Sequence, residues 1–149
     1  MAFTIDTNAA AHGIQLAVAP VFLLTAVSGM IGAVAGRLAR IIDRARKLED
    51  AALQSKDEAF IQRANAELDE LRIRGRLCNG CIGLLTSCAI LIGITIILLF
   101  VGETTSLDGS KIAVGTFLLG VCMFLGALIF FLRETLLATR VLDVHVRVK

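Results

Sequence analysis

The most reactive side chains in this sequence form a C-x-x-C motif, in which two residues separate Cys78 from Cys81. That spacing occurs in redox-active and zinc-binding sites. A zinc site needs further ligands, and neither a histidine nor a second cysteine pair lies nearby in the chain. We therefore expect both thiols, together with those of Cys88 and Cys122, to serve as small packing groups.

No other arrangement of residues in the sequence supports catalysis. We find no nucleophile paired with a base, no cluster of metal ligands, no phosphate-binding loop and no cofactor motif. The expectation is therefore a protein that is not an enzyme, with no catalytic residues, no metal ligands and no cofactor. The net charge of +2 is also too small to indicate a nucleic-acid-binding protein.

The composition of the chain is that of a membrane protein. Hydrophobic residues make up 56% of its 149 residues and charged residues 19%, and the mean hydropathy is +0.80. Soluble domains average about 45–50% apolar and about 25% charged residues. Four cysteines are too few for a small disulfide-stabilised domain.

Long stretches without any charged residue define three expected membrane spans. These stretches give predicted spans at residues 14–36, 77–102 and 112–132. About 20 apolar residues in a helix cross the ~30 Å hydrocarbon layer, and helices satisfy their own backbone hydrogen bonds in lipid. The expected fold is an all-α integral membrane protein with three transmembrane helices. Pro20 leaves two alternatives, because it either kinks the first span or opens it after a short interfacial helix over residues 7–19.

The basic residues predict how the chain is oriented in the membrane. Residues 37–76 contain ten of the fifteen lysines and arginines, and the tail 133–149 contains four more. The N-terminal segment 1–13 has none, and the loop 103–111 has only Lys111. The positive-inside rule therefore predicts that the N-terminus is outside and that the 37–76 segment and the C-terminus are cytoplasmic.

The 37–76 segment is expected to form a cytoplasmic antiparallel helical hairpin that extends from the first two spans. Apolar residues recur every three or four positions in both halves, which is typical of a coiled-coil seam. Ser55 and Glu58 have the spacing of a capping box that starts the second half. Folding the chain about that turn pairs Leu48 with Ala64, Ala45 with Leu68, Ile41 with Leu71 and Leu38 with Gly75.

Several motifs carry a resemblance to a known family. They are the Pro20-Val21-Phe22-Leu23-Leu24 core, the Arg37-Leu38-Ala39-Arg40 run, the Arg72-Ile73-Arg74-Gly75-Arg76 run and Leu98-Leu99-Phe100. With the surrounding residues 14–49, they resemble an uncharacterised family of bacterial inner-membrane proteins, known only as a domain of unknown function (twenty-seven twenty-one in the usual count). The resemblance implies a bacterial inner-membrane location and a three-span design, and it implies no activity.

Small residues recur every four positions along the first two spans. In lipid, such stripes allow helix backbones to approach closely. Two uses remain open, namely packing within one three-helix subunit and packing between subunits of a homo-oligomer. We define the small-residue faces, expected to pack in the oligomer, as Ser28, Gly29, Gly32, Ala33 and Gly36 on the first span and Gly83 and Ser87 on the second.

Charged residues gather at both ends of the spans. Arginines at the cytoplasmic ends form a basic collar that consists of Arg37, Arg40, Arg72, Arg74, Arg76 and Arg133. Each basic group near anionic head groups contributes about 1 kcal/mol of attraction, although topology marking alone also explains the collar. At the outer end, Glu103 and Asp108 form either an acidic ring at the mouth of an oligomer or an ordinary polar turn.

Two functions fit these features. The first is a small homo-oligomeric inner-membrane protein that is channel-like, with a pore formed by a ring of subunits. The alternative is a membrane-anchored scaffold or adaptor whose helical hairpin binds a cytoplasmic protein partner. The predicted spans contain no ionisable Asp, Glu, Lys or Arg, which argues against a pump or an ion-coupled transporter.

Overall fold

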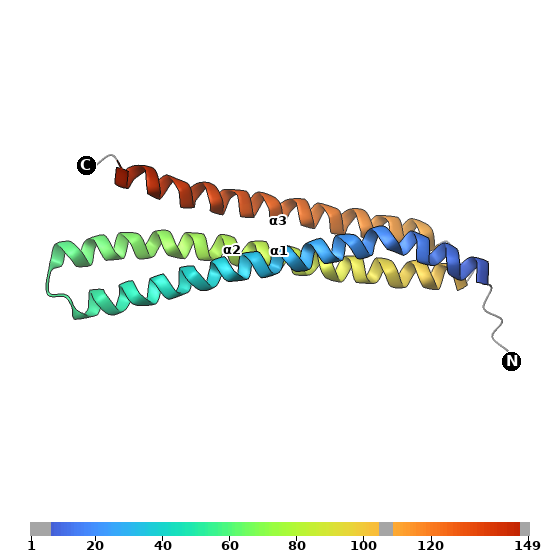
Figure 1. The fold of residues 1–149 in the computed structure, drawn as a ribbon, viewed down its shortest axis with the longest axis horizontal. Coiled ribbons are helices and arrows are strands. Elements are labelled where there is room, and N and C mark those ends of the chain that lie inside the picture. The colour runs from blue at the N-terminus through green and yellow to red at the C-terminus, as the bar shows by residue number, and fades with distance from the viewer. Residues whose placement is uncertain (1–6, 105–108, 147–149) are drawn as a thin grey trace. The chain divides into compact units, whose positions relative to one another are not determined.

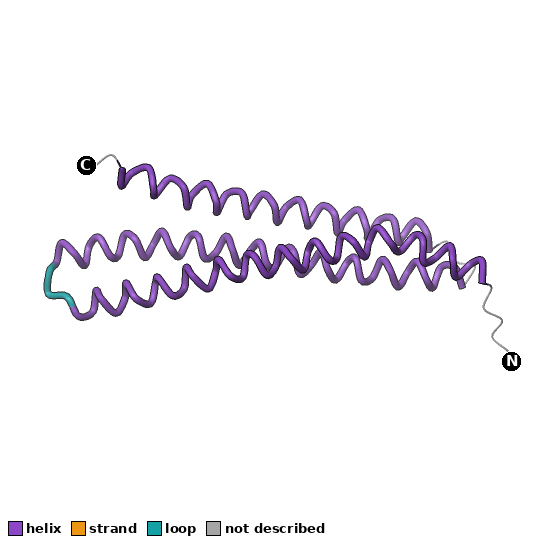
Figure 2. Tube along the Cα trace, in the orientation of Figure 1, coloured by secondary structure: helices purple, strands orange, loops and turns teal. Residues whose placement is uncertain are grey.

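The residues that the structure describes form three long helices (Figure 1). The computed structural model describes the backbone of residues 7–104 and 109–146, and the side chains of residues 13–102 and 111–139. The helices are α1 (Thr7–Gln54), α2 (Glu58–Thr104) and α3 (Gly109–Val146). The described part of the chain contains no strand, as Figure 2 shows. The all-α prediction is confirmed.

Each helix contains a segment that is long and apolar enough to cross a membrane. These segments are Gly13–Gln54, Glu58–Gly102 and Lys111–Thr139. Most of their apolar side chains are not buried in the single chain, and Phe22, Ile97 and Leu118 are among those that are exposed. Such a surface is unfavourable in water and favourable in hydrocarbon. The chain is therefore a multi-pass membrane protein by the length and composition of its helices.

Pro20 lies inside α1 and does not open it. The helix begins at Thr7 and continues through Pro20 to Gln54, so the alternative with a separate interfacial helix is wrong. Proline has no backbone N–H and therefore removes one hydrogen bond from the helix. Neighbouring helices and local adjustments make such a loss tolerable in a membrane span.

The short turn between α1 and α2 is closed by two side chains. The Oδ1 atom of Asp57 accepts a hydrogen bond from the N–H of Ala59 at 2.9 Å, and the Oγ atom of Ser55 accepts one from the N–H of Asp57 at 3.1 Å. Asp57 is therefore the N-cap of α2. The predicted capping box was wrong, because α2 begins at Glu58 and Ser55 lies too far before it to bond the first turn.

Contacts divide the chain into two compact units. The first consists of Met1–Ile31 with Leu84–Leu125, and the second of Gly32–Gly83 with Gly126–Lys149. In the first unit, Val27, Leu85 and Ile92 are fully buried. A Cβ atom at Gly120 would lie 3.1 Å from the Cδ1 atom of Ile92, so α3 approaches α2 closely there.

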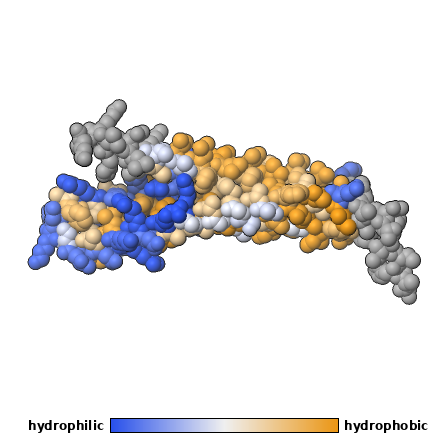
Figure 3. Space-filling model, in the orientation of Figure 1, coloured by the Kyte–Doolittle hydropathy of each residue, from blue (hydrophilic) through white to orange (hydrophobic). Residues whose placement is uncertain are grey.

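The second unit contains the hairpin formed by the adjoining ends of α1 and α2. Ile41 on α1 and Leu68 and Leu71 on α2 are buried. A Cβ atom at Gly75 would lie 4.0 Å from the side chains of both Leu38 and Ile41, which places Leu38 opposite Gly75 as the predicted register requires. Hydrophilic side chains gather on the outside of this hairpin, as Figure 3 shows.

Candidate functional site

The second unit contains a buried carboxylate that two arginines hold. Glu134 on α3 is 1% exposed. Its Oε2 atom accepts a hydrogen bond from Nη1 of Arg37 at 2.5 Å. Its Oε1 atom accepts bonds from Nη2 of Arg74 at 2.9 Å and from Nε of the same residue at 3.2 Å. Each oxygen therefore has its own guanidinium, and all three helices of the unit contribute one residue.

The ionised form of Glu134 is well compensated in this position. An isolated buried carboxylate is very costly, because it loses its hydration. Here two guanidinium groups face one carboxylate, which leaves one net positive charge. The side chains of Arg37 and Arg74 are 34% and 22% exposed, so their outer N–H groups still reach the surroundings.

Further groups on α3 hold Arg37 in place. The hydroxyl of Thr135 accepts a hydrogen bond from Nη1 of Arg37 at 2.9 Å and donates one to the carbonyl of Phe131 at 3.0 Å. The guanidinium carbon of Arg37 lies 5.0 Å from the centre of the Phe131 ring, within the range of a cation–π contact. One turn of α3 thus fixes the Arg37 side chain through a charge, a hydroxyl and a ring.

Sequence reasoning placed Arg37 and Arg74 in the basic collar but missed Glu134. The structure brings these two collar arginines together around one carboxylate. A signal was present in the sequence, because Glu134 is the first acidic residue after the third uncharged stretch. Glu134 and Arg37 each follow an uncharged stretch and Arg74 precedes one, so successive antiparallel spans bring all three to the same end.

The other collar arginines make no ion pair with Glu134 among the described side chains. Arg72 pairs with Asp69 on its own helix at 2.9 Å, and both side chains are well exposed. Arg40, Arg76 and Arg133 are exposed. Such surface ion pairs and charges contribute little to stability, typically about 0–1 kcal/mol. An external anion would bind the exposed arginines without competing with Glu134, whereas Arg37 and Arg74 already bond that carboxylate.

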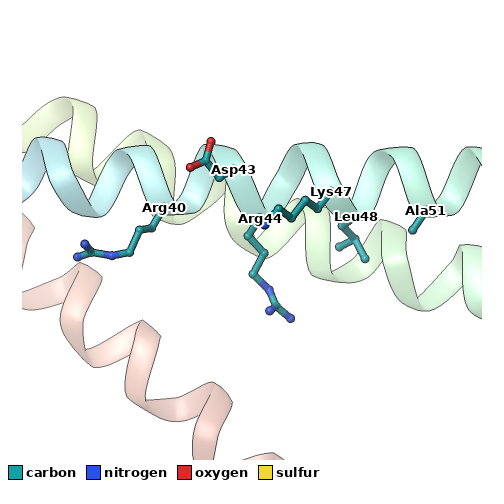
Figure 4. A pocket seen from close by; sticks show the side chains of 6 residues that line it. All are labelled: Arg40, Asp43, Arg44, Lys47, Leu48 and Ala51. Atoms are coloured by element: carbon teal, nitrogen blue, oxygen red, sulfur yellow. The ribbon is translucent and has the colours of Figure 1, made fainter.

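Two adjoining cavities in the second unit form a basic groove. The smaller, about 260 Å³, is lined by Arg37, Arg40, Ile41, Arg44, Leu71 and Arg74. The larger, about 480 Å³, is lined by Arg40, Asp43, Arg44, Lys47, Leu48 and Ala51, which Figure 4 shows. Because Arg40 and Arg44 line both cavities, we treat them as one groove.

The glycines of the spans fall into two groups, those packed closely against another helix and those with open space beside them. A Cβ atom at Gly80 would lie 2.8 Å from the ring of Phe130, and one at Gly120 would lie 3.1 Å from Ile92, so these glycines serve packing within the chain. A Cβ atom at Gly29 or Gly32 would meet nothing within 4 Å.

The small-residue faces belong largely to the second group. A Cβ atom at Gly83 would also meet nothing within 4 Å, whereas one at Gly36 would lie 4.0 Å from Nη1 of Arg40. Gly36 is partly exposed. The remaining members are exposed, namely Ser28, Gly29, Gly32, Ala33, Gly83 and Ser87.

Three of the four cysteines are packing residues. Cys78, Cys81 and Cys88 are buried and Cys122 is exposed, and none forms a disulfide. The thiol of Cys81 donates a hydrogen bond to the carbonyl of Ala127 at 3.2 Å. Among the residues that the structure describes, no group of histidine, cysteine or acidic side chains is arranged to hold a metal ion.

Threonines within the spans are satisfied inside the chain. The hydroxyls of Thr95 and Thr116 lie 2.9 Å apart, and each also lies within hydrogen-bond distance of a carbonyl of its own helix. One hydroxyl donates to the other, and the accepting hydroxyl donates to its own helix. Thr95 is 2% exposed. The hydroxyl of Thr25 likewise bonds the carbonyl of Val21. Of the predicted outer-mouth residues, Glu103 lies in the last turn of α2 with its side chain outside the described set, and Asp108 lies outside the described residues.

Three long apolar helices that carry a polar hairpin define a multi-pass helical membrane protein. The chain belongs to a family described as "Protein of unknown function (DUF2721)", whose match covers residues 17–144. The family resemblance seen in the sequence is confirmed. No curated protein and no solved structure matches the chain.

Proposed function

We propose that this protein is a homo-oligomeric, channel-like protein of the bacterial inner membrane. One observation carries the proposal: apart from the partly exposed Gly36, the small-residue faces on α1 and α2 are exposed, and a Cβ atom at Gly29, Gly32 or Gly83 would meet nothing within 4 Å. Within lipid, exposed stripes of small residues favour close helix packing. A second copy of the chain offers the same stripes and is therefore a natural partner.

The channel-like part of the proposal follows from where neutral polar groups lie. The hydroxyls of Thr95 and Thr116 find their hydrogen-bond partners in each other or in their own helices, so in this proposal they do not line a path within one subunit. Ser28 and Asn79 are exposed and neutral. A conducting path therefore belongs at the centre of a ring of subunits, lined by such residues.

The proposed orientation follows the distribution of basic residues. The 37–76 segment contains ten of the fifteen lysines and arginines and is cytoplasmic in this proposal, as is the C-terminus, with the N-terminus outside. The basic collar then lies at the level of anionic head groups on the cytoplasmic side.

Cross-linking in membranes tests the proposed contact. In a Cys122→Ser background, Ala33→Cys places a thiol on the small-residue face of α1, and Gly115→Cys places one at an equally open position on α3. We expect an oxidant to cross-link subunits at position 33 and to leave position 115 monomeric. Equal cross-linking at both positions, or none at position 33, would argue against the contact.

A flux assay tests conduction separately. The purified full chain is reconstituted into liposomes that hold an ion-sensitive dye, beside protein-free liposomes. We expect ion flux that rises steeply with the protein-to-lipid ratio, since several subunits form each path. Cross-linked oligomers without any flux would support the proposed assembly and contradict the proposed conduction.

A scaffold or adaptor role is the second candidate, and the hairpin tip favours it. Leu53 near the end of α1 is 82% exposed, and Phe60 at the start of α2 is 36% exposed. Apolar side chains exposed among polar ones offer a contact surface to a protein partner. Replacing both by serine would abolish partner capture from a bacterial lysate under this candidate, with unchanged ion flux in liposomes.

A further inference from the structure

The basic groove collects four guanidinium groups within a small volume. Arg37, Arg40, Arg44 and Arg74 all line the cavity of about 260 Å³. Figure 4 shows the side chains of Arg40 and Arg44 extending from the same side of α1, while the carboxylate of Asp43 lies on the opposite side. The acidic residue of the larger cavity is therefore directed away from the two guanidinium groups.

The groove carries more positive than negative charge. Glu134 engages Arg37 and Arg74, and Glu67 engages Arg44 through Nε at 2.7 Å. Among the side chains that the structure describes, no carboxylate lies within salt-bridge distance of Arg40 or Lys47. Two carboxylates against four guanidinium groups leave the smaller cavity with two net positive charges.

The groove is also organised in advance of any ligand. A guanidinium has five N–H donors, and the bonds to Glu134 and Glu67 leave several of those on Arg37, Arg44 and Arg74 unused. The same bonds fix the arginine side chains, so less conformational entropy is lost when an anion binds. Planar arginine groups arranged in this way recognise phosphate oxygens, often two at a time.

We propose that the basic groove binds the phosphate group of an anionic ligand. Ile41 and Leu71 give the cavity apolar walls beside the arginines, and Arg37 directly follows the uncharged stretch of α1. Two sources present this chemistry at such a position, namely the head group of an anionic phospholipid and a soluble phosphate ester. The proposal concerns one subunit and does not depend on oligomer formation.

Binding by the full-length protein with two probes tests the proposal and separates the sources. The first probe is inorganic pyrophosphate, titrated into nanodiscs of phosphatidylcholine that hold the protein. The second is phosphatidylglycerol, counted by native mass spectrometry after extraction from mixed nanodiscs. Arg40→Gln and Lys47→Gln each remove a charge from the groove, and Arg46→Gln removes an exposed charge of the same helix that does not line it.

Arg40→Gln is expected to weaken binding of the true ligand class about tenfold, the loss of one charge-assisted contact. Lys47→Gln should weaken it less, and Arg46→Gln by under about twofold. A loss confined to phosphatidylglycerol assigns the lipid head group, and a loss confined to pyrophosphate assigns a soluble phosphate. If the protein binds neither probe, the proposal is overturned. It is also overturned if Arg46→Gln loses as much affinity as Arg40→Gln, because that result indicates diffuse electrostatic attraction. Circular dichroism checks that each variant keeps its helices.

Discussion

Glu134 connects all three helices of the second unit. It is 1% exposed, and its two oxygens bond arginines from two other helices. Its position in the sequence marks the end of the third span but does not show that its side chain is buried. A glutamate that follows an apolar stretch is usually a solvated residue at the end of a span, and only the packing of three helices buries it.

Replacing Glu134 by alanine is expected to destabilise the folded chain by about 2–4 kcal/mol, somewhat less than for a fully buried pair because both arginines are partly exposed. Glu67→Ala breaks the exposed pair with Arg44 and is expected to cost under about 1 kcal/mol. Thermal unfolding in detergent, followed by circular dichroism, compares the two variants. Equal stability of both variants would contradict a special role for Glu134.

Gly80 and Gly93 should respond to alanine with opposite signs. A Cβ atom at Gly80 would lie 2.8 Å from the ring of Phe130, whereas one at Gly93 on the same helix would meet nothing within 4 Å. Gly80→Ala is expected to destabilise by about 1–3 kcal/mol through overpacking. Gly93→Ala should stabilise by up to about 1 kcal/mol through helix propensity. The same unfolding assay checks both, and a stabilised Gly80→Ala variant would refute the close approach.

At the scale of elements, the sequence predicted the hairpin better than the packing within the spans. In the hairpin, apolar residues recur every three or four positions among polar ones, so the sequence itself indicates the buried face of each helix. The structure places Leu38 opposite Gly75, as that pattern predicts. Within the spans nearly every residue is apolar, so hydrophobicity does not distinguish a lipid-facing side from a packed side. The buried positions Cys78, Cys81, Leu85, Cys88 and Ile92 on α2 emerge only from the structure.

The hairpin should open when its seam receives a charge. Leu68 is 9% exposed, and Leu68→Asp would bury an unpaired carboxylate between α1 and α2. We expect the variant to be cut by protease within the 37–76 segment much faster than the wild type. Ala66→Asp, at an exposed position two residues away, should leave the rate unchanged. Equal protease resistance in all three proteins would show that Leu68 does not hold the hairpin closed.

For the whole molecule, the orientation in the membrane can be checked directly. We expect the N-terminus outside and the C-terminus in the cytoplasm, because the basic residues concentrate on the side of the hairpin and the tail. Reporter fusions at residue 3 and residue 149 should be active on opposite sides of the membrane. Activity of both fusions on the same side would rule out an odd number of spans in this orientation.

Self-association is expected from the physics of packing in lipid rather than from any single contact. Lipid supplies no hydrophobic drive between spans, so the small-residue faces must provide close contact. Gly32→Leu is therefore expected to dissociate the oligomer without preventing insertion, and Gly115→Leu, at a position equally open in the single chain, should not.

Native mass spectrometry of the intact protein, released from nanodiscs, tests the central claim most directly. A closed homo-oligomer at a multiple of the 15.9 kDa chain mass is the predicted result, with the Gly32→Leu variant shifted to the mass of one chain and the Gly115→Leu variant unchanged. Detection of the wild-type protein only at the mass of a single chain would contradict homo-oligomer formation and therefore also the proposed channel.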